Sequence, residues 1–324
     1  MNININYSFI IPHKNCPDLL QRCVDSIPER DDVQIIVVDD NSDSDKKPAL
    51  KERKNLQIIL LDAAQSKGAG RARNVGLEHA KGKWLVFSDS DDFFVNNLSD
   101  FLDAYLNDNH DIICFNVREC DCYDTSKIYA GGNKDRIFKK YKETNNDIYL
   151  RVCYTEPWGK FIKRKVVIEN KIYFQETMAH NDLLFSVKTG LMAGKVCLVD
   201  KPLYWYVTRE GSIRHSTESF EKTCDRILAW NSTQLFLKEQ GIDTTIYLPI
   251  RPCIKFLKRN IMVYLRLLIF MKKNNMNYVR AFCDTLRYLF AKYFKKSSIT
   301  LEKSLSKTSV TIWKRNSDIS ELSV

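Results

Sequence analysis

The sequence contains no apolar run long enough to cross a membrane. The longest apolar stretch near the C-terminus, Ile261 to Met271, is about half the length of a membrane-spanning helix and carries Arg266. The N-terminus lacks the basic start and apolar core of a secretory signal. We therefore expect a cytoplasmic protein.

Cysteine is present, but not at the spacing that binds zinc. The ten cysteines are scattered, the one close pair is the CxC of Cys120 and Cys122, and no two CxxC units occur. We expect no structural zinc site, and we expect reduced thiols that serve mainly as small core residues. Internal repeats and low-complexity tracts are also absent. The remaining composition, 44% hydrophobic and 28% charged, is that of a folded globular protein.

The net charge of +10 is confined to the C-terminal third. Residues 1–217 contain 31 Lys and Arg against 31 Asp and Glu, whereas residues 218–324 contain 19 against 9. This distribution favours a separate basic region with an anionic partner. It argues against a catalytic domain wrapped around nucleic acid, so we expect no nucleic-acid partner. A basic nucleic-acid-binding protein, suggested by the pI of about 9.0, is the least favoured alternative.

Short apolar runs alternate with amphipathic stretches in the first half of the chain. Continuous apolar strands separated by helices predict an α/β fold whose parallel sheet is covered on both faces. Ligands of such sheets bind at the carboxyl ends of the strands. The predicted strands are Ser8–Ile11 (ended by Pro12), Val33–Val38, Leu56–Leu61, Trp84–Phe87 and Asp111–Val117, and the predicted helices are Leu19–Ile27 and Ala69–Ala80.

From residue 218 onward the pattern is helical and basic. Such helices suit an anionic membrane surface, which makes residues 251–296 a candidate for peripheral contact with the plasma membrane. The alternatives are packing on the catalytic domain or a homodimer. Residues 297–324 are polar and Ser-rich, and we expect a loose tail. The apolar face consists of Val279, Phe282, Cys283, Leu286, Phe290 and Tyr293; the basic positions are Arg251, Lys255, Lys258, Arg259, Arg266, Arg280, Arg287 and Lys295.

Two acidic clusters follow predicted strands. Three carboxylates within Asp89-Ser90-Asp91-Asp92 repel one another unless a cation lies between them, and Mg²⁺ or Mn²⁺ prefers such oxygen ligands. The alternative is a solvated turn that caps the next helix. In Asp39-Asp40-Asn41-Ser42, one carboxylate could accept hydrogen bonds from uracil or ribose, and the alternative is an Asx turn with an N-cap.

A glycine-containing loop, Lys67 to Asn74, leads into a predicted helix. It is neither a Walker loop nor a GxGxxG motif. Arg71 and Arg73 in the first helical turn oppose the helix dipole but suit a diphosphate. The alternative is a tight turn that begins a basic helix.

Four segments, taken in order, resemble the family 2 glycosyltransferases of the GT-A fold. They are SFIIPHKN, IIVVDDNS, GAGRARNVGLEHAKGKWLVFSDSDD and HNDLLF. The resemblance covers roughly the first two-thirds of the chain. It implies a Rossmann-like, mostly parallel central sheet flanked by helices, within a catalytic domain over residues 1–217. That domain has a nucleotide-sugar-binding half (1–118) and an acceptor-binding half (119–217), followed by the helical region 218–324.

The resemblance also implies roles for single residues. Asp91 matches the metal ligand of the family's DxD motif, and Asp89 reaches the ribose or the metal; Asp92 assists in either role. Asp182 matches the aspartate that acts as general base, with an N-cap as its alternative role. Asn181 stands where many relatives have Glu, which puts in question the support that Glu gives to the base. The implied nucleotide contacts are Pro12, His13, Asn15, Asp39, Asp40 (for the base) and Arg71.

Two further segments resemble parts of the family's acceptor region. In Trp158-Gly159-Lys160, the indole either stacks on a sugar or packs in the core. In Tyr204 to His215, any of Arg209, Ser212, Arg214 and His215 could reach the diphosphate.

The implied activity is an inverting, metal-dependent transfer of one sugar from a nucleotide-sugar, a UDP-sugar, to a hydroxyl group. The acceptor would be a glycan or a lipid-linked saccharide in capsule, exopolysaccharide or lipopolysaccharide synthesis, at the inner face of the plasma membrane. The QxxRW motif and the membrane spans of processive synthases are absent, which favours transfer of a single sugar. The alternative is an inactive relative that only binds nucleotide-sugars.

Overall fold

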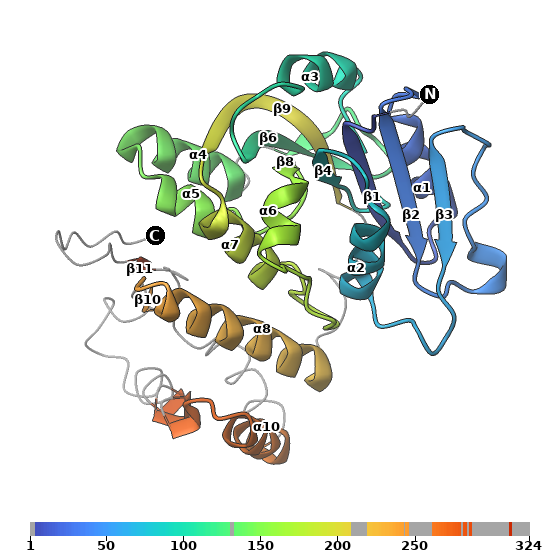
Figure 1. Cartoon of the computed structure of the whole chain (residues 1–324). Coiled ribbons are helices and arrows are strands. Elements are labelled where there is room, and N and C mark those ends of the chain that lie inside the picture. The colour runs from blue at the N-terminus through green and yellow to red at the C-terminus, as the bar shows by residue number, and fades with distance from the viewer. Residues whose placement is uncertain are drawn as a thin grey trace. The chain divides into compact units, whose positions relative to one another are not determined.

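A computed structural model describes residues 4–129, 133–208, 219–242, 244–245, 261–279, 281–283, 285–286 and 311–312. The chain forms two compact units, Met1–Thr217 and Glu218–Val324 (Figure 1). Within the described ranges, none of the helices has both the length and the hydropathy needed to cross a bilayer.

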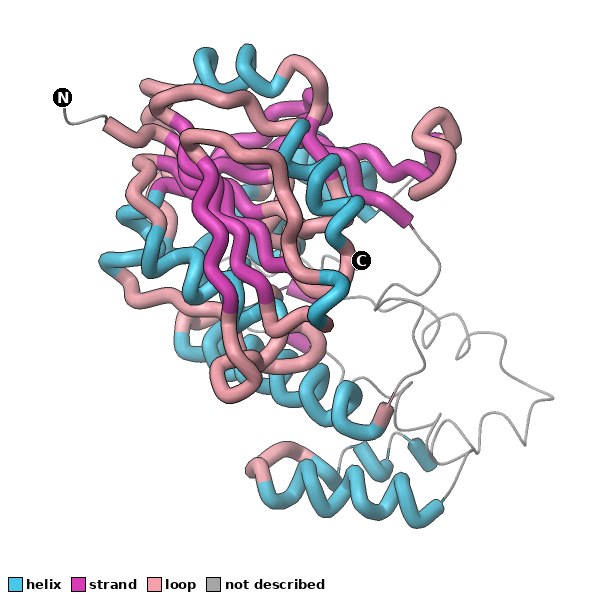
Figure 2. Tube along the Cα trace, turned by 90° about the vertical axis from the view of Figure 1, so that its right-hand side faces the viewer, coloured by secondary structure: helices cyan, strands magenta, loops and turns pink. Residues whose placement is uncertain are grey.

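The first unit contains one large sheet with the strand order β3-β2-β1-β4-β8-β6-β9-β5, and β7 adds to β6. Figure 2 views the molecule from the β3 end of this sheet. The strands are β1 (Tyr7–His13), β2 (Val33–Asp39), β3 (Leu56–Leu60), β4 (Trp84–Phe87), β5 (Phe93–Phe94), β6 (Ile112–Asp121), β7 (Ile128–Tyr129), β8 (Lys160–Lys163) and β9 (Val196–Thr208). The helices are α1 (Pro17–Asp25), η1 (Ser44–Lys46), α2 (Ala69–His79), α3 (Leu98–Tyr105), α4 (Asn133–Thr144), α5 (Asp147–Cys153), α6 (Arg164–Glu169) and α7 (Leu183–Met192).

The first four strands of this order are parallel, as predicted. β1 runs through Pro12 to His13 instead of stopping at Pro12. The carbonyl of His13 accepts the N–H of Asp40, just after β2, so the backbone groups of His13 face β2. Because these groups alternate along a strand, those of residue 12 face β4. The pairing with β4 ends at Ile10, so the missing N–H of Pro12 leaves no ladder bond unmade. The strand therefore delivers His13 to the carboxyl edge of the sheet.

The second half of the sheet is mixed. β8 lies antiparallel between β4 and β6, and β5 is antiparallel to β9. The long β9 runs parallel to β6 with register shifts around Asn116. From β9 the side chain of Tyr204 reaches the residues that follow β4, where its hydroxyl accepts the N–H of Asp89 at 2.9 Å.

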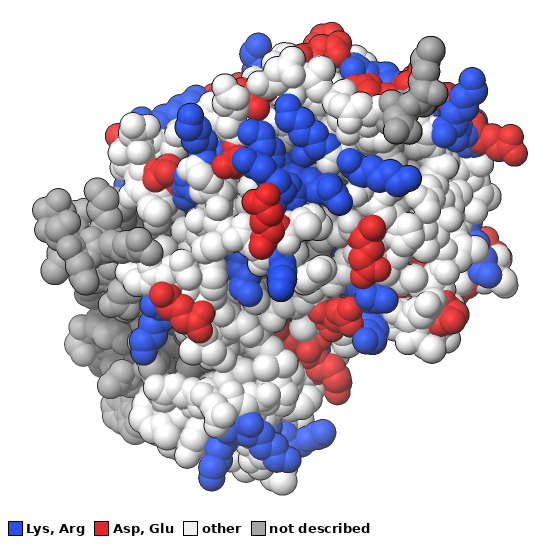
Figure 3. Space-filling view, in the orientation of Figure 1, with Lys and Arg blue, Asp and Glu red and all other residues white. Residues whose placement is uncertain are grey.

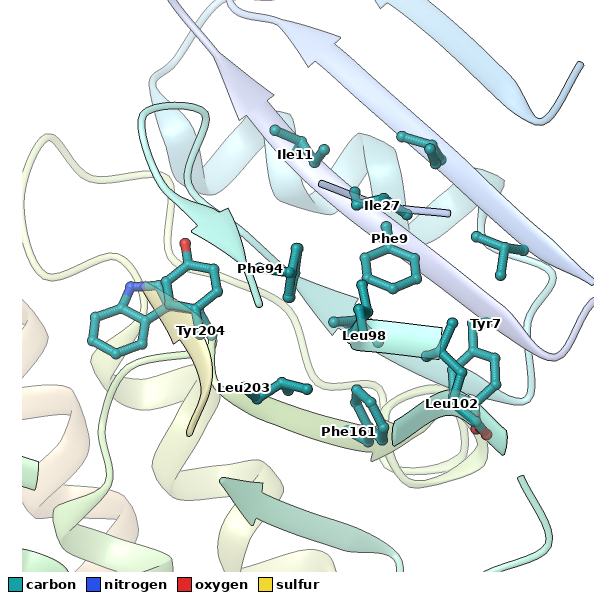
Figure 4. Packing of buried hydrophobic residues seen from close by; sticks show 14 of the residues in the cluster. Tyr7, Phe9, Ile11, Ile27, Phe94, Leu98, Leu102, Phe161, Leu203 and Tyr204 are labelled. Atoms are coloured by element: carbon teal, nitrogen blue, oxygen red, sulfur yellow. The ribbon is translucent and has the colours of Figure 1, made fainter. Parts of the chain in front are cut away.

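Helices cover both faces of the parallel half. Leu20 and Val24 of the amphipathic α1 join a buried cluster with Phe9 and Ile35. On the other face, Gly76 of α2 approaches so closely that an added Cβ would lie 2.4 Å from the Ile10 side chain. Figure 4 shows how the core continues from β1 across α3 to Phe161 and Tyr204 in the mixed half. Burial of this cluster holds the strand ends in a fixed order.

The second unit is built from α8 (Phe220–Glu239) and α10 (Ile261–Lys273), with a short pair of β10 (Thr244–Thr245) and β11 (Thr311–Ile312). Ile227 of α8 and Leu267 of α10 belong to its buried cluster. The apolar face predicted around Val279 and Phe282 is exposed, and Ala281 is buried instead. The predicted positions Arg251, Lys255, Lys258, Arg259, Arg280, Arg287, Phe290, Tyr293 and Lys295, and the tail apart from residues 311–312, lie outside the described residues.

Charge is mixed over the surface. On the face drawn in Figure 3, a group of Lys and Arg side chains lies above the centre, with Asp and Glu side chains among and below them. The first unit therefore presents both signs side by side on this face, in line with its balanced composition.

Candidate active site

The loops that follow β1 and β2 are joined by buried polar side chains. His13 Nδ1 lies 2.8 Å from Asp39 Oδ1, and His13 Nε2 accepts the Cys16 N–H at 3.2 Å. With Nε2 as the acceptor, the Nδ1 side of the ring is directed at Asp39. The hydroxyl of Ser42 donates to the same Asp39 oxygen at 2.5 Å. His13 and Asp39 are thus directed at each other, and both side chains are buried.

Asp40 connects the end of β2 to the start of α2. Its carboxylate accepts the N–H of Lys67 at 3.2 Å and the N–H of Gly68 at 3.1 Å, and Lys14 Nζ lies 3.5 Å away. Asn15, in the left-handed region with φ 57°, donates its N–H to Ser42. These bonds fix a rigid, polar rim at the edge where the sequence predicted the nucleotide site.

Arg71 and Arg73 leave α2 in different directions. Arg71 is partly exposed, and its Nη1 lies 3.7 Å from Glu176. Arg73 is buried: Nη2 donates to Asp89 at 2.5 Å, and Nη1 donates to the side-chain oxygen of Asn181 at 2.7 Å. Arg73 therefore joins the acidic segment to the start of α7. The sequence marked both arginines as suited to a diphosphate, but it did not predict these two bonds of Arg73.

The side chains of the acidic segment are not equivalent. Asp92 is fully buried, and its two carboxylate oxygens accept bonds from the Tyr204 hydroxyl and the Val207 N–H, both at 2.7 Å. Burial raises the pKa of Asp92 well above its usual value. Asp92 therefore anchors the segment to β9. Partial desolvation raises the pKa of Asp89, and the Arg73 guanidinium opposes that rise.

The residues that could hold a metal ion are few. No group of three or more His, Cys, Asp or Glu side chains suited to a metal ion occurs within the described part of the chain. Asp89 and Asp91 remain as carboxylates that are only partly buried. Mg²⁺ is commonly bound by one or two carboxylates together with substrate phosphates. The residues therefore fit a cation that a diphosphate ligand completes.

Asp182 lies directly before α7, but its side chain makes no hydrogen bond to the helix end. The N-cap alternative is therefore not realised. Burial raises the pKa of the Asp182 carboxyl to about 6. The positive charge of Arg73 opposes this rise, and the negative charges of Glu156 and Asp89 add to it. A carboxylate whose pKa approaches neutrality is suited to accept a proton.

Two buried lysines, Lys134 and Lys160, lie close enough to Asp182 to feel its charge. Lys134 of α4 forms an ion pair with Glu156, and Lys160 donates to the carbonyl of Tyr154 at 2.5 Å. Burial lowers the pKa of both lysines, that of Lys160 to about 8, and the charge of Asp182 counteracts this in both. Lys134 and Glu156 could not be predicted from the sequence, because no local pattern indicates an ion pair between residues 22 positions apart.

Trp158 packs between the sheet and this charged group. Its ring is only 8% exposed and stacks on Tyr204 at 5.4 Å and on Tyr206 at 5.7 Å between ring centres. Of the two alternatives, stacking on a sugar or packing in the core, the structure shows the indole in the core. The predicted loop residues Arg209, Ser212, Arg214 and His215 lie outside the described residues.

Comparisons with known proteins agree with this geometry. Residues 8–170 match the family model described as glycosyl transferase family 2. The chain is 25% identical over 217 residues to the poly(ribitol-phosphate) beta-N-acetylglucosaminyltransferase TarS of Staphylococcus aureus, covering 64% of this chain and 36% of that protein. It is 28% identical over 216 residues to a poly(ribitol-phosphate) beta-glucosyltransferase of Bacillus spizizenii, covering 63% and 32%. It thus spans about a third of the length of these two relatives.

Two further similarities extend the comparison. A cholesterol galactosyltransferase of Borreliella burgdorferi is 25% identical over 225 residues, covering 65% of this chain and 61% of that protein. The crystal structure of S. aureus TarS 1–349 in complex with UDP-GlcNAc superposes with a TM-score of 0.56 at 19% identity, covering 98% of this chain and 99% of that one. This likeness confirms the predicted fold.

Proposed function

This chain belongs to glycosyl transferase family 2, and on that premise we propose that it transfers one sugar from a UDP-sugar to a hydroxyl group of a glycan or lipid-linked acceptor, with inversion at the anomeric carbon. One observation carries the proposal. Asp182, with a pKa of about 6, directly follows Asn181, and Arg73 bonds both Asn181 and the DxD residue Asp89. A base and a diphosphate site that one arginine holds together suit a displacement between donor and acceptor.

The donor would bind along the carboxyl ends of β1, β2 and β4. The rim formed by Pro12, His13, Asn15 and Asp39 would shape the nucleotide pocket, with Asp40 nearest the base. Arg71, partly exposed at the start of α2, would contact the base or a phosphate. Asp91 and Asp89 would hold Mn²⁺ or Mg²⁺ with the phosphates, and the ion, when bound, neutralises charge that develops on the leaving diphosphate.

The chemical step uses Asp182 as general base. Its carboxylate takes the proton from the acceptor hydroxyl while that oxygen forms a bond to the anomeric carbon. The bond from this carbon to the diphosphate oxygen breaks, and UDP leaves with the electron pair. One displacement inverts the configuration. Asn181 stands where many members of the family have Glu, and its side chain carries no charge. Its oxygen accepts a hydrogen bond from Arg73 and so orients the guanidinium beside the base.

The relatives support a hexose donor, because their names assign them N-acetylglucosamine, glucose and galactose transfer. The second unit supports an acceptor held at an anionic membrane surface. Met262, Leu265 and Ile269 of α10 are exposed, basic side chains lie beside them, and the helix contains no acidic residue. Capsule, exopolysaccharide or lipopolysaccharide synthesis at the inner face of the plasma membrane would fit this arrangement.

A turnover assay tests the proposal. UDP release from a panel of UDP-sugars would be followed with and without saccharide and lipid-linked acceptors, and the product anomer would be read by NMR. Acceptor-dependent release with an inverted product supports the transferase. Tight binding of a UDP-sugar with no release for any acceptor would favour the inactive, nucleotide-sugar-binding alternative.

The acid limb of the pH profile follows from Asp182. The base acts only when deprotonated, and its pKa is raised to about 6. The value of kcat/KM should therefore fall about tenfold per pH unit below that pKa and level off above it. The profile would be recorded with saturating Mn²⁺ and a folding check at each pH. A limb that ends near pH 4, where an ordinary aspartate titrates, would contradict the assignment.

A further inference from the structure

Within the part of the chain that the structure describes, the outer edge of β3 has no strand partner. β3 forms one end of the large sheet, and no other strand of the described residues bonds to its far side (Figures 1 and 2). The orientation of its backbone follows from two bonds to β2: the carbonyl of Asn55 accepts from Ile35, and the N–H of Leu61 donates to Asp39. Since backbone groups alternate along a strand, residues 55, 57, 59 and 61 face β2. The backbones of residues 56, 58 and 60 therefore face outward.

The side chains of this edge are apolar. Leu56, Ile58 and Leu60 lie on one face, where Ile58 is 40% exposed and Leu60 is 53% exposed. By contrast, every residue of β1 and nearly every residue of β2 is buried. The strand contains no charged residue and no proline, which are the devices that usually prevent an edge from pairing. The edge thus offers both free backbone groups and an apolar row.

This edge is complementary to a second copy of itself. The outward residues read Leu-Ile-Leu in both directions about Ile58. A twofold axis perpendicular to the sheet would place the two strands antiparallel. With Ile58 opposite Ile58 of the second copy, the two residues exchange both backbone bonds, and each Leu60 N–H reaches a Leu56 carbonyl. The Leu56 N–H already donates to the backbone carbonyl of Arg53 in its own chain, so it needs no partner in the second copy.

Charge complementarity favours the same register. Lys54 lies four residues before Ile58 and Asp62 lies four residues after it, and both are exposed. Lys54 lies in the turn before β3, and the antiparallel register centred on Ile58 brings that end of each strand toward the end of the partner strand that is followed by Asp62. Opposite charges across an antiparallel pair are stabilising, and apolar pairs add to them. We propose that the β3 edge is a homodimer interface in which two copies join their sheets about Ile58.

Sedimentation velocity of the full chain over a concentration series tests this interface. Wild type should show a reversible dimer. Ile58→Lys and Ile58→Glu each place like charges opposite one another at the axis, so each should weaken the dimer by roughly tenfold or more. Gln57→Lys is the matched control: it adds the same charge to an exposed position of the same strand on the other face of the sheet, and it should leave dimerisation within about threefold of wild type.

A mixture makes the register itself testable. When Ile58→Lys and Ile58→Glu chains are combined, opposite charges meet at the axis, and a mixed dimer should form where neither variant dimerises alone. Circular dichroism would verify that each variant is folded. A wild type that stays monomeric at every concentration, a dimer that tolerates Ile58→Lys, or a mixture that fails to associate would overturn the proposal.

Discussion

Replacing Asp182 with Asn is expected to lower kcat about 10³-fold, which corresponds to about 4 kcal/mol of transition-state stabilisation. The amide has nearly the same size as the carboxylate but cannot accept the proton of the acceptor hydroxyl. Because the Asp182 side chain makes no capping bond to α7, the fold should be unaffected. Donor affinity should stay within about threefold, since the lost interaction serves the chemical step. Stopped assays of sugar transfer and calorimetric titration of the donor would measure both quantities.

The matched control is Asp100→Asn, which removes an exposed carboxylate from the first turn of α3. It should retain wild-type kcat. The acid limb of the pH profile should also disappear in Asp182→Asn, because no other group replaces the lost titration. Residual activity within tenfold of wild type, with an unchanged acid limb, would show that another residue is the base.

Replacing Arg73 with Gln is expected to reduce kcat/KM about 100-fold, the scale on which loss of one positioned electrostatic group acts. The guanidinium bonds both Asp89 and Asn181, so its loss frees the acidic segment from the start of α7. Its charge also lowers the pKa of Asp182. The acid limb should therefore move to higher pH in Arg73→Gln. Rate measurements across pH would show the drop in rate and the shift in one experiment.

Two further variants distinguish the effect of the Arg73 charge from that of its hydrogen-bond geometry and from a general loss of ion pairs. Arg73→Lys keeps the positive charge but cannot hydrogen-bond Asp89 and Asn181 as the guanidinium does. The value of kcat/KM should therefore fall, while the acid limb stays close to its wild-type position. Arg30→Gln removes ion pairs to Asp32 and Asp103 near the amino ends of the strands. This variant is the control for the loss of ion pairs alone and should leave the pH profile unchanged. A wild-type pH profile in Arg73→Gln would contradict the coupling to Asp182.

Much of the fold could be predicted because the signal is local. β4 has the predicted bounds, and β2, β3 and α2 differ from their predicted ranges by one residue. These segments are continuous apolar runs or amphipathic turns whose burial follows directly from their pattern. The ordered motifs also predicted the family, which the comparison confirms.

The remaining features depend on pairing between distant segments. Local periodicity does not reveal that β8 inserts between β4 and β6, because that order is decided by packing across many residues. The same applies to Asp92, whose partners Tyr204 and Val207 lie more than a hundred residues away. Arg73 was named with Arg71 as suited to a diphosphate, but its bonds to Asp89 and Asn181 could not be predicted, because those partners lie 16 and 108 residues away.

The most direct test of the account is calorimetric titration of UDP-sugars into the full chain, with and without Mn²⁺, for wild type and Asp91→Ala. We expect one UDP-sugar to bind wild type in a Mn²⁺-dependent manner, and we expect Asp91→Ala to lose this dependence while remaining folded. Failure of every UDP-sugar to bind folded wild type, or equal Mn²⁺-dependent binding by Asp91→Ala, would contradict it.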